Sequence, residues 1–276
     1  MPRQKNSQPR WDQRIDRAKE LAEVYPFASE ILSFYAEIAS FQKSLLAGLK
    51  SAGGNGAQPS DFLPFRDSLD LAPLLPSFPA LFSLVGRVGT SVLAQAAEEL
   101  AHEDSAYWEE LLSAYWGTES DEVEDAPQTH VFFARALLQP YAEHFAARWA
   151  VDLPRFGPSV CPICGSKPQV GVLREEGHGA KRSLVCSLCL TEWDYRRVVC
   201  PACGEERFDK LAAYTASQFE HMRVEACDTC KVYINTVDLT KNGLAIPVVD
   251  EVAALPLGLW AQENGYTKLQ SNLLGI

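Results

Sequence analysis

The sequence has no long uninterrupted run of apolar residues. Its most apolar segment, from Leu71 to Gly86, contains three prolines and is too short to cross a bilayer as a helix. The basic N-terminus, MPRQKNSQPR, is followed by no apolar stretch and contains no twin-arginine pair. We therefore expect no secretory signal and no membrane insertion, and we expect the protein to be cytoplasmic.

Positive charge is also scarce. The chain has 25 Lys and Arg against 36 Asp and Glu, a formal net charge of −11. Residues 1–150 hold 12 basic and 21 acidic residues (−9), whereas residues 151–276 hold 13 and 15 (−2). Neither half offers the concentrated positive charge with which proteins bind phosphate backbones. We expect no nucleic-acid partner.

Common catalytic patterns are missing as well. The sequence contains no Gly-rich phosphate loop, no GxSxG and no HExxH. The acidic run at 117–127 is too polar to form an acid/base pair and predicts a solvated linker. The five histidines, which show no ligand spacing among themselves, are His102, His130, His144, His178 and His221. We expect each to lie on the surface or on a helix face. Only His178 and His221 lie between cysteine pairs, and for these two a contact with the outside of a metal site or with a partner is the alternative.

The cysteines, in contrast, are highly organised. All eight lie in four Cys-x-x-Cys pairs: Cys161/Cys164, Cys186/Cys189, Cys200/Cys203 and Cys227/Cys230. Two thiolates on one tight turn supply half of a tetrahedral metal site, so four turns supply two sites. In a reducing compartment, such pairs favour metal binding over disulfides. We predict two mononuclear sites with these eight cysteines as ligands.

An internal repeat bears on how the pairs combine. The segments CPICG (161–165) and CPACG (200–204) agree at four of five positions, and a second pair follows each after 21 and 23 residues. The repeat favours sequential pairing, in which the first pair joins the second and the third joins the fourth. A cross-braced arrangement is the alternative.

The pair sequences also limit the chemistry. Proline presets φ for a tight turn, and the glycine after the second cysteine allows the positive φ that directs backbone N–H groups at the sulfurs. Four thiolates leave no open coordination position, so we expect no water-activating metal and no enzyme active site. Zinc and iron both fit such a cage. Zinc would be structural, whereas a single iron would be redox-active, as in rubredoxin.

Hydrophobic periodicity predicts an α+β multidomain protein. Helical spacing, divided at Pro26, covers residues 11–49 and recurs at 79–100, 106–116, 131–150 and 248–265. Residues 51–61 predict a loop, and the proline-rich 62–79 an extended connector. Short β-type runs cover 170–173, 183–185, 192–199, 223–226 and 232–237. The expected domains are an all-α N-terminal domain of about five helices (1–152), two rubredoxin-like four-cysteine units with short β-hairpins (153–198 and 199–240) and a C-terminal helical segment (241–276).

Two features beside the second pair have competing interpretations. Trp193 and Tyr195 either pack over the metal unit or form a stacking platform for nucleic acid. Arg196 and Arg197 form a small basic spot that is typical of a solvated strand edge.

Several segments together resemble the family of formate dehydrogenase accessory proteins FdhE. The most specific is RSLVCSLCLTEWDYRRVVCPACG, preceded by CPICGSKPQVGVL. The segments YPFASEILSFYAEIASFQ, VFFARALLQPYAEHFAARW and VDEVAALPLGLWAQENGY extend the resemblance over nearly the whole chain. The resemblance implies a non-catalytic cytoplasmic protein that is needed for active respiratory formate dehydrogenase and that binds the catalytic subunit before export. It also implies rubredoxin-like iron on the eight cysteines, and so favours iron over zinc.

Two other functional classes remain as alternatives. A zinc-ribbon module that binds nucleic acid or protein would contain purely structural zinc, and its nucleic-acid form conflicts with the charge of −2 in residues 151–276. A thiol–disulfide oxidoreductase would need an exposed thiolate of low pKa in a βαβ setting, which this region does not predict. A homodimer is compatible with the sequence.

Overall fold

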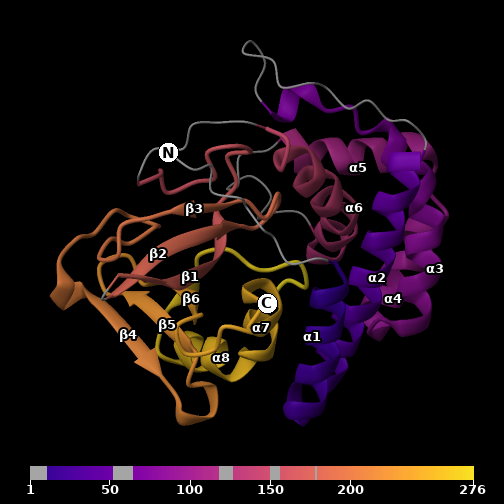
Figure 1. The fold of residues 1–276 in the computed structure, drawn as a ribbon. Helices are drawn as coiled ribbons and strands as arrows, with labels where there is room; N and C mark the ends of the chain where they lie inside the picture. The colour runs from indigo at the N-terminus through magenta and orange to yellow at the C-terminus, as the bar shows by residue number, and fades with distance from the viewer. Residues whose placement is uncertain (1–10, 52–64, 118–126, 150–155, 178) are drawn as a thin grey trace.

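The helices of the N-terminal half lie on one side of the molecule and the sheet lies on the other (Figure 1). The computed structural model describes residues 11–51, 65–117, 127–149, 156–177 and 179–276. Three predicted features lie outside the described parts, apart from their end residues. They are the loop at 51–61, the acidic linker at 117–127 and the domain boundary between residues 152 and 153.

The predicted helical N-terminal half is confirmed. Within the described residues it contains α1 (Trp11–Val24), α2 (Ser29–Ser51), α3 (Phe78–Val88), α4 (Ser91–Ala101), α5 (Ser105–Gly117) and α6 (Gln128–Ala146). The division at Pro26 is also confirmed, because a 3-10 turn, η1 (Pro26–Ala28), separates α1 from α2. Pro140 lies inside α6, which is almost entirely buried from Phe132 onward.

The single helix expected at 79–100 is wrong, since the segment forms two helices, α3 and α4. The break occurs at Gly89, which is extended, and a Cβ there would lie only 2.6 Å from the carbonyl oxygen of Val85. Thr90 then caps α4 by accepting a hydrogen bond from the Leu93 amide. Apolar residues keep their helical spacing through this break, so periodicity alone predicts one helix where the structure has two.

The extended connector predicted at 62–79 is also incorrect in its described part. Residues 66–77 form two 3-10 segments, η2 (Arg66–Ser68) and η3 (Ala72–Ser77). Pro73, at the start of η3, has its φ preset for a helical turn, and Pro76 lies inside the segment, so this proline-rich stretch coils. It packs on the helices as expected, because Leu74 and Phe65 are buried.

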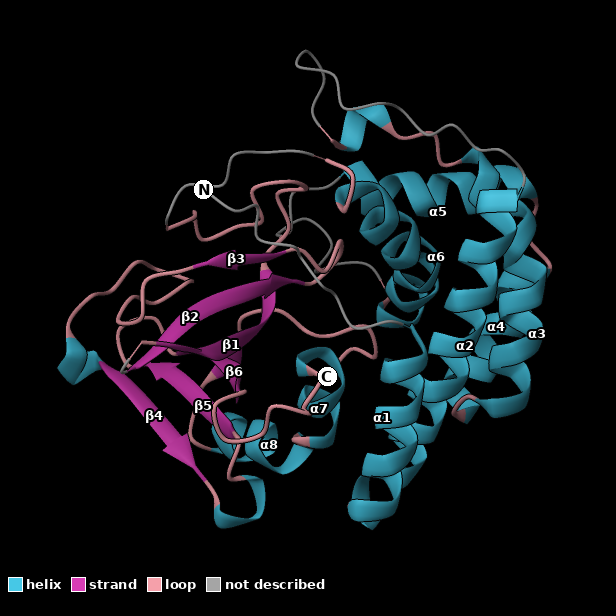
Figure 2. Cartoon of the chain, in the orientation of Figure 1, coloured by secondary structure: helices cyan, strands magenta, loops and turns pink. Residues whose placement is uncertain are grey.

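The described strands form one seven-stranded sheet (Figure 2). They are β1 (Pro168–Glu176), β2 (Gly179–Cys186), β3 (Glu192–Asp194), β4 (Leu211–Thr215), β5 (Met222–Cys227), β6 (Val232–Asp238) and β7 (Thr267–Lys268). The order is β3-β2-β1-β6-β5-β4, with β7 beside β6. Neighbours are antiparallel except β1/β6 and β6/β7. Four of the five predicted runs are strands, the run at 192–199 is a strand only over its first three residues, and β4 and β7 were not predicted.

The two expected cysteine units share this sheet. The first contributes β1–β3 and the second contributes β4–β6, and the parallel β1/β6 pair joins them, with Val170 opposite Asn235. The division of residues 153–240 into two domains stays a prediction.

The predicted C-terminal helical segment forms α7 (Pro247–Ala253) and α8 (Leu255–Glu263), which meet at Ala254. In Figure 1, α7 and α8 lie between the sheet and α1. A buried ion pair fixes this layer, because Arg17 of α1 donates two hydrogen bonds to Asp250 of α7, at 3.0 and 2.5 Å. His221 Nε2 lies 2.9 Å from the same carboxylate.

Two cores result from this arrangement. One contains Val170, Val172 and Val224 from one face of the sheet, packed against α1, α2, α7 and α8. The other runs from α2–α6 to the first four cysteines and to Leu184 and Ile234 on the opposite face. No helix in the described parts of the chain has the length and apolar character needed to span a membrane.

Candidate metal centres

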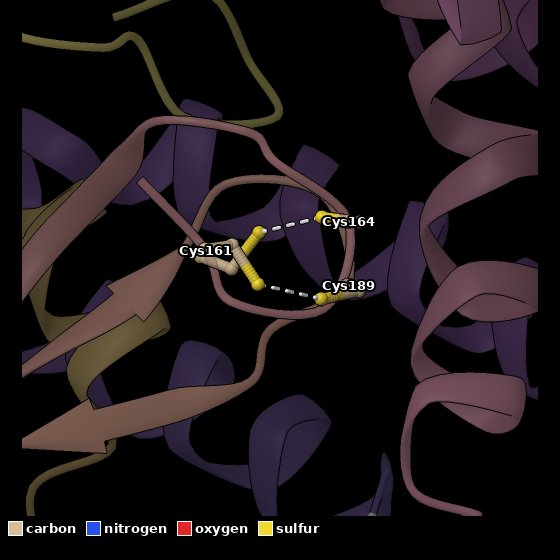
Figure 3. A group of neighbouring side chains, drawn as sticks. Cys161, Cys164 and Cys189 are labelled. Carbon is tan, nitrogen blue, oxygen red and sulfur yellow. Dashed lines mark hydrogen bonds between the residues drawn. The ribbon is translucent and has the colours of Figure 1, made fainter. Parts of the chain in front are cut away.

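The first two cysteine pairs meet in one cluster. Their sulfur atoms lie within 4.8 Å of one another, with Cys161 Sγ 3.5 Å from Cys189 Sγ and Cys164 Sγ 3.3 Å from Cys186 Sγ. Figure 3 shows Cys161, Cys164 and Cys189 directed toward one another from neighbouring turns. All four residues of this first cluster are buried.

The third and fourth pairs form the second cluster. Cys200 Sγ lies 3.7 Å from Cys230 Sγ, and Cys203 Sγ lies 3.7 Å from Cys227 Sγ. Here Cys203 is exposed and Cys230 is half-buried. The structure therefore groups the pairs sequentially, as the repeat predicted, and the cross-braced alternative does not occur.

Each pair forms the same tight turn. The residue after the second cysteine has a positive φ in all four: 78° at Gly165, 53° at Leu190, 77° at Gly204 and 58° at Lys231. In three of the turns, the amide of this residue donates to the carbonyl of the first cysteine, at 2.9–3.0 Å. Backbone amides also donate to sulfur, from Leu188 to Cys186 Sγ at 3.3 Å and from Ala202 to Cys200 Sγ at 3.4 Å. The turns are thus preformed to present sulfur.

The donor sets fit a four-coordinate metal ion. A tetrahedral ion with metal–sulfur bonds of ~2.3 Å places its ligand sulfurs roughly 3.8 Å apart, close to the separations in both clusters. A disulfide would require sulfurs at about 2.05 Å, and all eight cysteines are free. Burial raises the pKa of the Cys186 and Cys189 thiols, whereas hydrogen bonds from neighbouring cysteines, first from Cys161, lower the pKa of Cys164. A bound cation would favour the thiolate form of Cys186 and Cys189.

Arg66 connects the first turn of this cluster to the helical half. Its Nε donates to the carbonyl oxygen of Cys164 at 2.7 Å, and a terminal nitrogen donates to Ser166 Oγ, also at 2.7 Å. Another terminal nitrogen donates to the carbonyl oxygen of Trp116, and the indole of Trp116 donates to the carbonyl oxygen of Arg66 at 2.8 Å. The turn is therefore fixed to η2 and to the end of α5.

Helix α6 holds the second turn of the same cluster. The carbonyl oxygen of Ser187 accepts hydrogen bonds from Arg135 at 3.2 Å and from Gln139 at 3.1 Å. Arg135 is 1% exposed and also donates to the carbonyl oxygens of Ser271 and Asn272, at 3.1 and 2.5 Å. One buried guanidinium thus joins α6, a cysteine turn and the C-terminal segment.

Hydroxyl groups complete the surroundings of the first cluster. Ser166 Oγ lies 3.5 Å from Cys164 Sγ, and Thr191 Oγ1 lies 3.1 Å from Cys189 Sγ. Both residues stand two positions after the second cysteine of their pair. Hydrogen bonds from hydroxyls spread the negative charge of ligating thiolates. At the same position in the second cluster stand Glu205 and Val232.

The second cluster is surrounded by surface charges instead. Glu205 accepts a hydrogen bond from Thr229 at 2.7 Å, and Lys231 pairs with Asp228 at 2.7 Å. These groups are half-exposed or exposed. No residue of α1–α6 contributes a described hydrogen bond to this cluster.

The aromatic residues after the second pair pack inside the protein. Trp193 is 2% exposed and donates to the carbonyl oxygen of Pro158 at 2.9 Å. Tyr195 is 6% exposed, and its hydroxyl lies 3.1 Å from Ser159 Oγ. Burial of both rings supports the packing interpretation and argues against a stacking platform. Arg196 and Arg197 are exposed.

The histidines contribute no described ligand to either cluster. His178 lies outside the described residues. His221 precedes β5, whereas Cys227 ends that strand, and its ring contacts Asp250 rather than sulfur. His102 bonds to its own helix through the Glu98 carbonyl.

Sequence reasoning missed the residues that support the first cluster. Arg66, Arg135 and Gln139 lie in the helical half, far from the cysteines in sequence, and none belongs to a recognisable motif. Only the unusual placement of Arg135 and Gln139 within the apolar stretch of α6 could have indicated buried hydrogen bonding.

Comparison with known proteins finds similarity to FdhE proteins by family model, by sequence and by structure. A family model described as FdhE, central domain, matches residues 160–197, and one described as FdhE, C-terminal domain, matches residues 198–274. A Protein FdhE homolog of Aquifex aeolicus is 31% identical over 275 residues, which cover 95% of this chain and 94% of the relative. A Protein FdhE homolog of Rhizobium meliloti is 28% identical over 274 residues, which cover 94% and 87%.

A solved structure is similar over nearly its whole length. The crystal structure of the FdhE protein from Pseudomonas aeruginosa matches with a TM-score of 0.71 and 25% identity. The match covers 97% of this chain and 96% of that one.

Proposed function

Because this chain belongs to the FdhE family, we propose that it is a non-catalytic accessory protein in the maturation of a formate dehydrogenase. In this proposal it binds the catalytic subunit of a respiratory formate dehydrogenase in the cytoplasm, before that subunit is exported. Its role is to act on the immature enzyme rather than to convert a substrate itself.

One observation carries the proposal. The two four-cysteine clusters both lie inside the region that the family models match, and each is a closed set of four sulfurs. A closed set leaves no coordination position for substrate. The Aquifex relative also matches over the helical half, so the resemblance includes the helices that support the first cluster.

We propose that the eight cysteines are metal ligands and that the metal is iron, with zinc as the alternative. The donor sets suit both metals, and the preference for iron comes from the resemblance to FdhE proteins. Iron in a four-sulfur set would supply one-electron redox chemistry. The chain's own contribution is to direct amide and hydroxyl groups at the sulfurs, and in the first cluster to exclude water.

The helical half is the proposed docking region. Residues 1–150 carry a net charge of −9, whereas residues 151–276 are close to neutral at −2. We also propose that the chain has four domains, with boundaries after residues 152, 198 and 240, and that it forms a homodimer.

Binding is tested with the full-length, tagged chain produced together with the catalytic subunit. We expect the subunit to co-purify, and we expect an unrelated exported redox enzyme of similar size not to do so. Recovery of neither protein, or of both equally, would refute the proposed partner.

The metal is tested on protein purified anaerobically without added metal. Near two irons per chain, with visible bands that bleach on reduction, is the expected result. Two zincs and no colour would overturn the iron assignment while leaving the partner proposal intact.

A further inference from the structure

A cavity of about 110 Å³ lies between the sheet and the segment that carries the third cysteine pair. Residues of β4, β5 and β6, with Arg182 of β2, line it on one side, and residues 197–201 line it on the other. Arg223 and Glu225 stand two positions apart on β5, so they face the same side of the sheet. Cys200 and Cys227 also contribute to the lining, which places the cavity against the second cluster.

The charge of the lining is unusual for this acidic protein. Three arginines, Arg182, Arg197 and Arg223, contribute to the lining with a single carboxylate, that of Glu225, and Arg197 also donates to the carbonyl oxygen of Ala180 at 3.2 Å. Glu225 accepts hydrogen bonds from Arg223 Nε, at 2.9 Å, and from a terminal nitrogen of Arg223, and it pairs with Arg182 at 2.6 Å. One carboxylate cannot neutralise three guanidinium groups, so the cavity has an excess of positive charge.

The Arg182 guanidinium also has an unsatisfied donor. Its terminal nitrogens bond to Glu225 and to the carbonyl oxygens of Arg196 and Val199, at 3.1 and 3.2 Å for the carbonyls. Its Nε has no hydrogen-bond partner among the described residues, although the residue is 3% exposed. Buried donors are nearly always paired in folded proteins. An acceptor from outside the chain would satisfy this one.

The remaining lining is apolar and restricts the ligand further. It includes Val198, Val199, Leu211, Val232, Ile234 and Leu269. An inorganic oxyanion would present charged oxygens to these side chains, whereas an anion with one charged end and a short hydrocarbon end would match both parts. An engineered cavity of about 150 Å³ holds benzene, so this smaller one suits a ligand of about four to six non-hydrogen atoms.

We propose that this cavity binds a short-chain monocarboxylate. The carboxylate accepts hydrogen bonds from Arg182 Nε and from Arg223, and the hydrocarbon end lies among the valine and leucine side chains. Arg197, Val198 and Ala213 are exposed, so the ligand enters from solvent at this rim. Occupancy would change the surroundings of Cys200 and Cys227, and it does not depend on the identity of the metal or of the protein partner.

The test is calorimetric titration of the full-length, metal-loaded chain at constant ionic strength. Sodium formate, acetate, propionate and butyrate are the probes, and chloride and phosphate are the comparison anions. We expect saturable binding with a dissociation constant of about 1 mM for the best-fitting carboxylate, and none for chloride or phosphate. No saturation by any carboxylate, or equal binding of chloride, would overturn the proposal.

Variants separate charge from shape. Arg223→Gln should weaken binding about tenfold, since hydrogen bonds between charged groups are the strong ones. Ala213→Leu keeps every charge but fills the cavity, and it should abolish binding. Arg207→Gln changes an exposed arginine that pairs with Asp209 outside the cavity, and it should bind as the parent does. Unchanged affinity in both cavity variants, with two metal ions retained, would locate binding elsewhere and refute the site.

Discussion

The two four-cysteine clusters are built from the same turn, yet their surroundings differ. In the first cluster all four cysteines are buried, and residues of η2 and α6 bond to its turns. In the second cluster Cys203 is exposed, and α1–α6 contribute no described hydrogen bond to its turns. The same turn therefore occurs in two settings. The first cluster lies at the junction of helices and sheet, and the second lies at the surface.

Because of this difference, we expect the first cluster to contribute more to the stability of the fold and the second to be more accessible to solvent. Loss of the first cluster should disturb the core that includes α3–α6, because cysteines and helix side chains belong to the same hydrophobic cluster. Loss of the second should disturb mainly β4–β6 and the adjacent turns.

The largest effect is expected from removing one ligand of each cluster. Cys186→Ser should prevent folding of the whole chain, because structural metal sites contribute on the order of 10 kcal/mol and typical domains are stable by only about 5–15 kcal/mol. Cys203→Ser should lose one metal ion but keep the helical half folded. Elemental analysis and thermal unfolding by circular dichroism measure both. Equal damage by the two variants would contradict the contrast.

A smaller but substantial effect is expected at Arg135. Arg135→Met keeps the hydrocarbon stem but leaves the carbonyls of Ser187, Ser271 and Asn272 without this donor. We expect the free energy of unfolding to fall by about 3 kcal/mol, measured in urea with metal bound. Arg207→Met, at an exposed ion pair, is the matched control and should show no measurable change. A similar stability for both variants would show that Arg135 does not support the first cluster.

Metal release should proceed in two phases. With excess chelator, we expect one ion to leave at least about tenfold faster than the other, because exposed sites open without unfolding of the core. The chelator complex is followed by absorbance. Cys203→Ser should lack the fast phase, and a single phase in the parent protein would contradict the predicted difference in access.

The smallest effect concerns the hydroxyl beside Cys189. Thr191→Val keeps the shape but removes the group that lies 3.1 Å from the sulfur. We expect a loss of about 1 kcal/mol, or a decrease in Tm of about 2–4 °C. Glu205→Gln, at the equivalent position of the second cluster, should leave Tm unchanged. A larger shift for Glu205→Gln would reverse the ranking of the two clusters.

Much of the candidate site could be predicted because its determinants are local. Two cysteines three positions apart must share a turn, and the repeat placed the turns in sequential order. Glycine at 165 and 204 indicated the positive φ that the structure has. The same conformation at Leu190 and Lys231 could not be foreseen, because side chains rarely adopt it and no residue type marks it there.

The support of the first cluster could not be predicted, because it depends on contacts distant in sequence. Arg66 and Cys164 are 98 positions apart, and Arg135 and Ser187 are 52 apart. Hydrophobic periodicity identified the helices but not the break at Gly89, because that break depends on a close contact with the backbone rather than on the apolar pattern. It identified most strands but not that both cysteine units join in one sheet.

The parallel pairing of β1 with β6 has a consequence for the order of events during synthesis. β6 begins after Cys230, the last cysteine, so β1 has only β2 beside it until all eight cysteines have been made. A chain that stopped at residue 198 would present the unpaired edge of β1, and such edges promote aggregation. The first unit thus reaches its final shape only when the ribosome has completed the second.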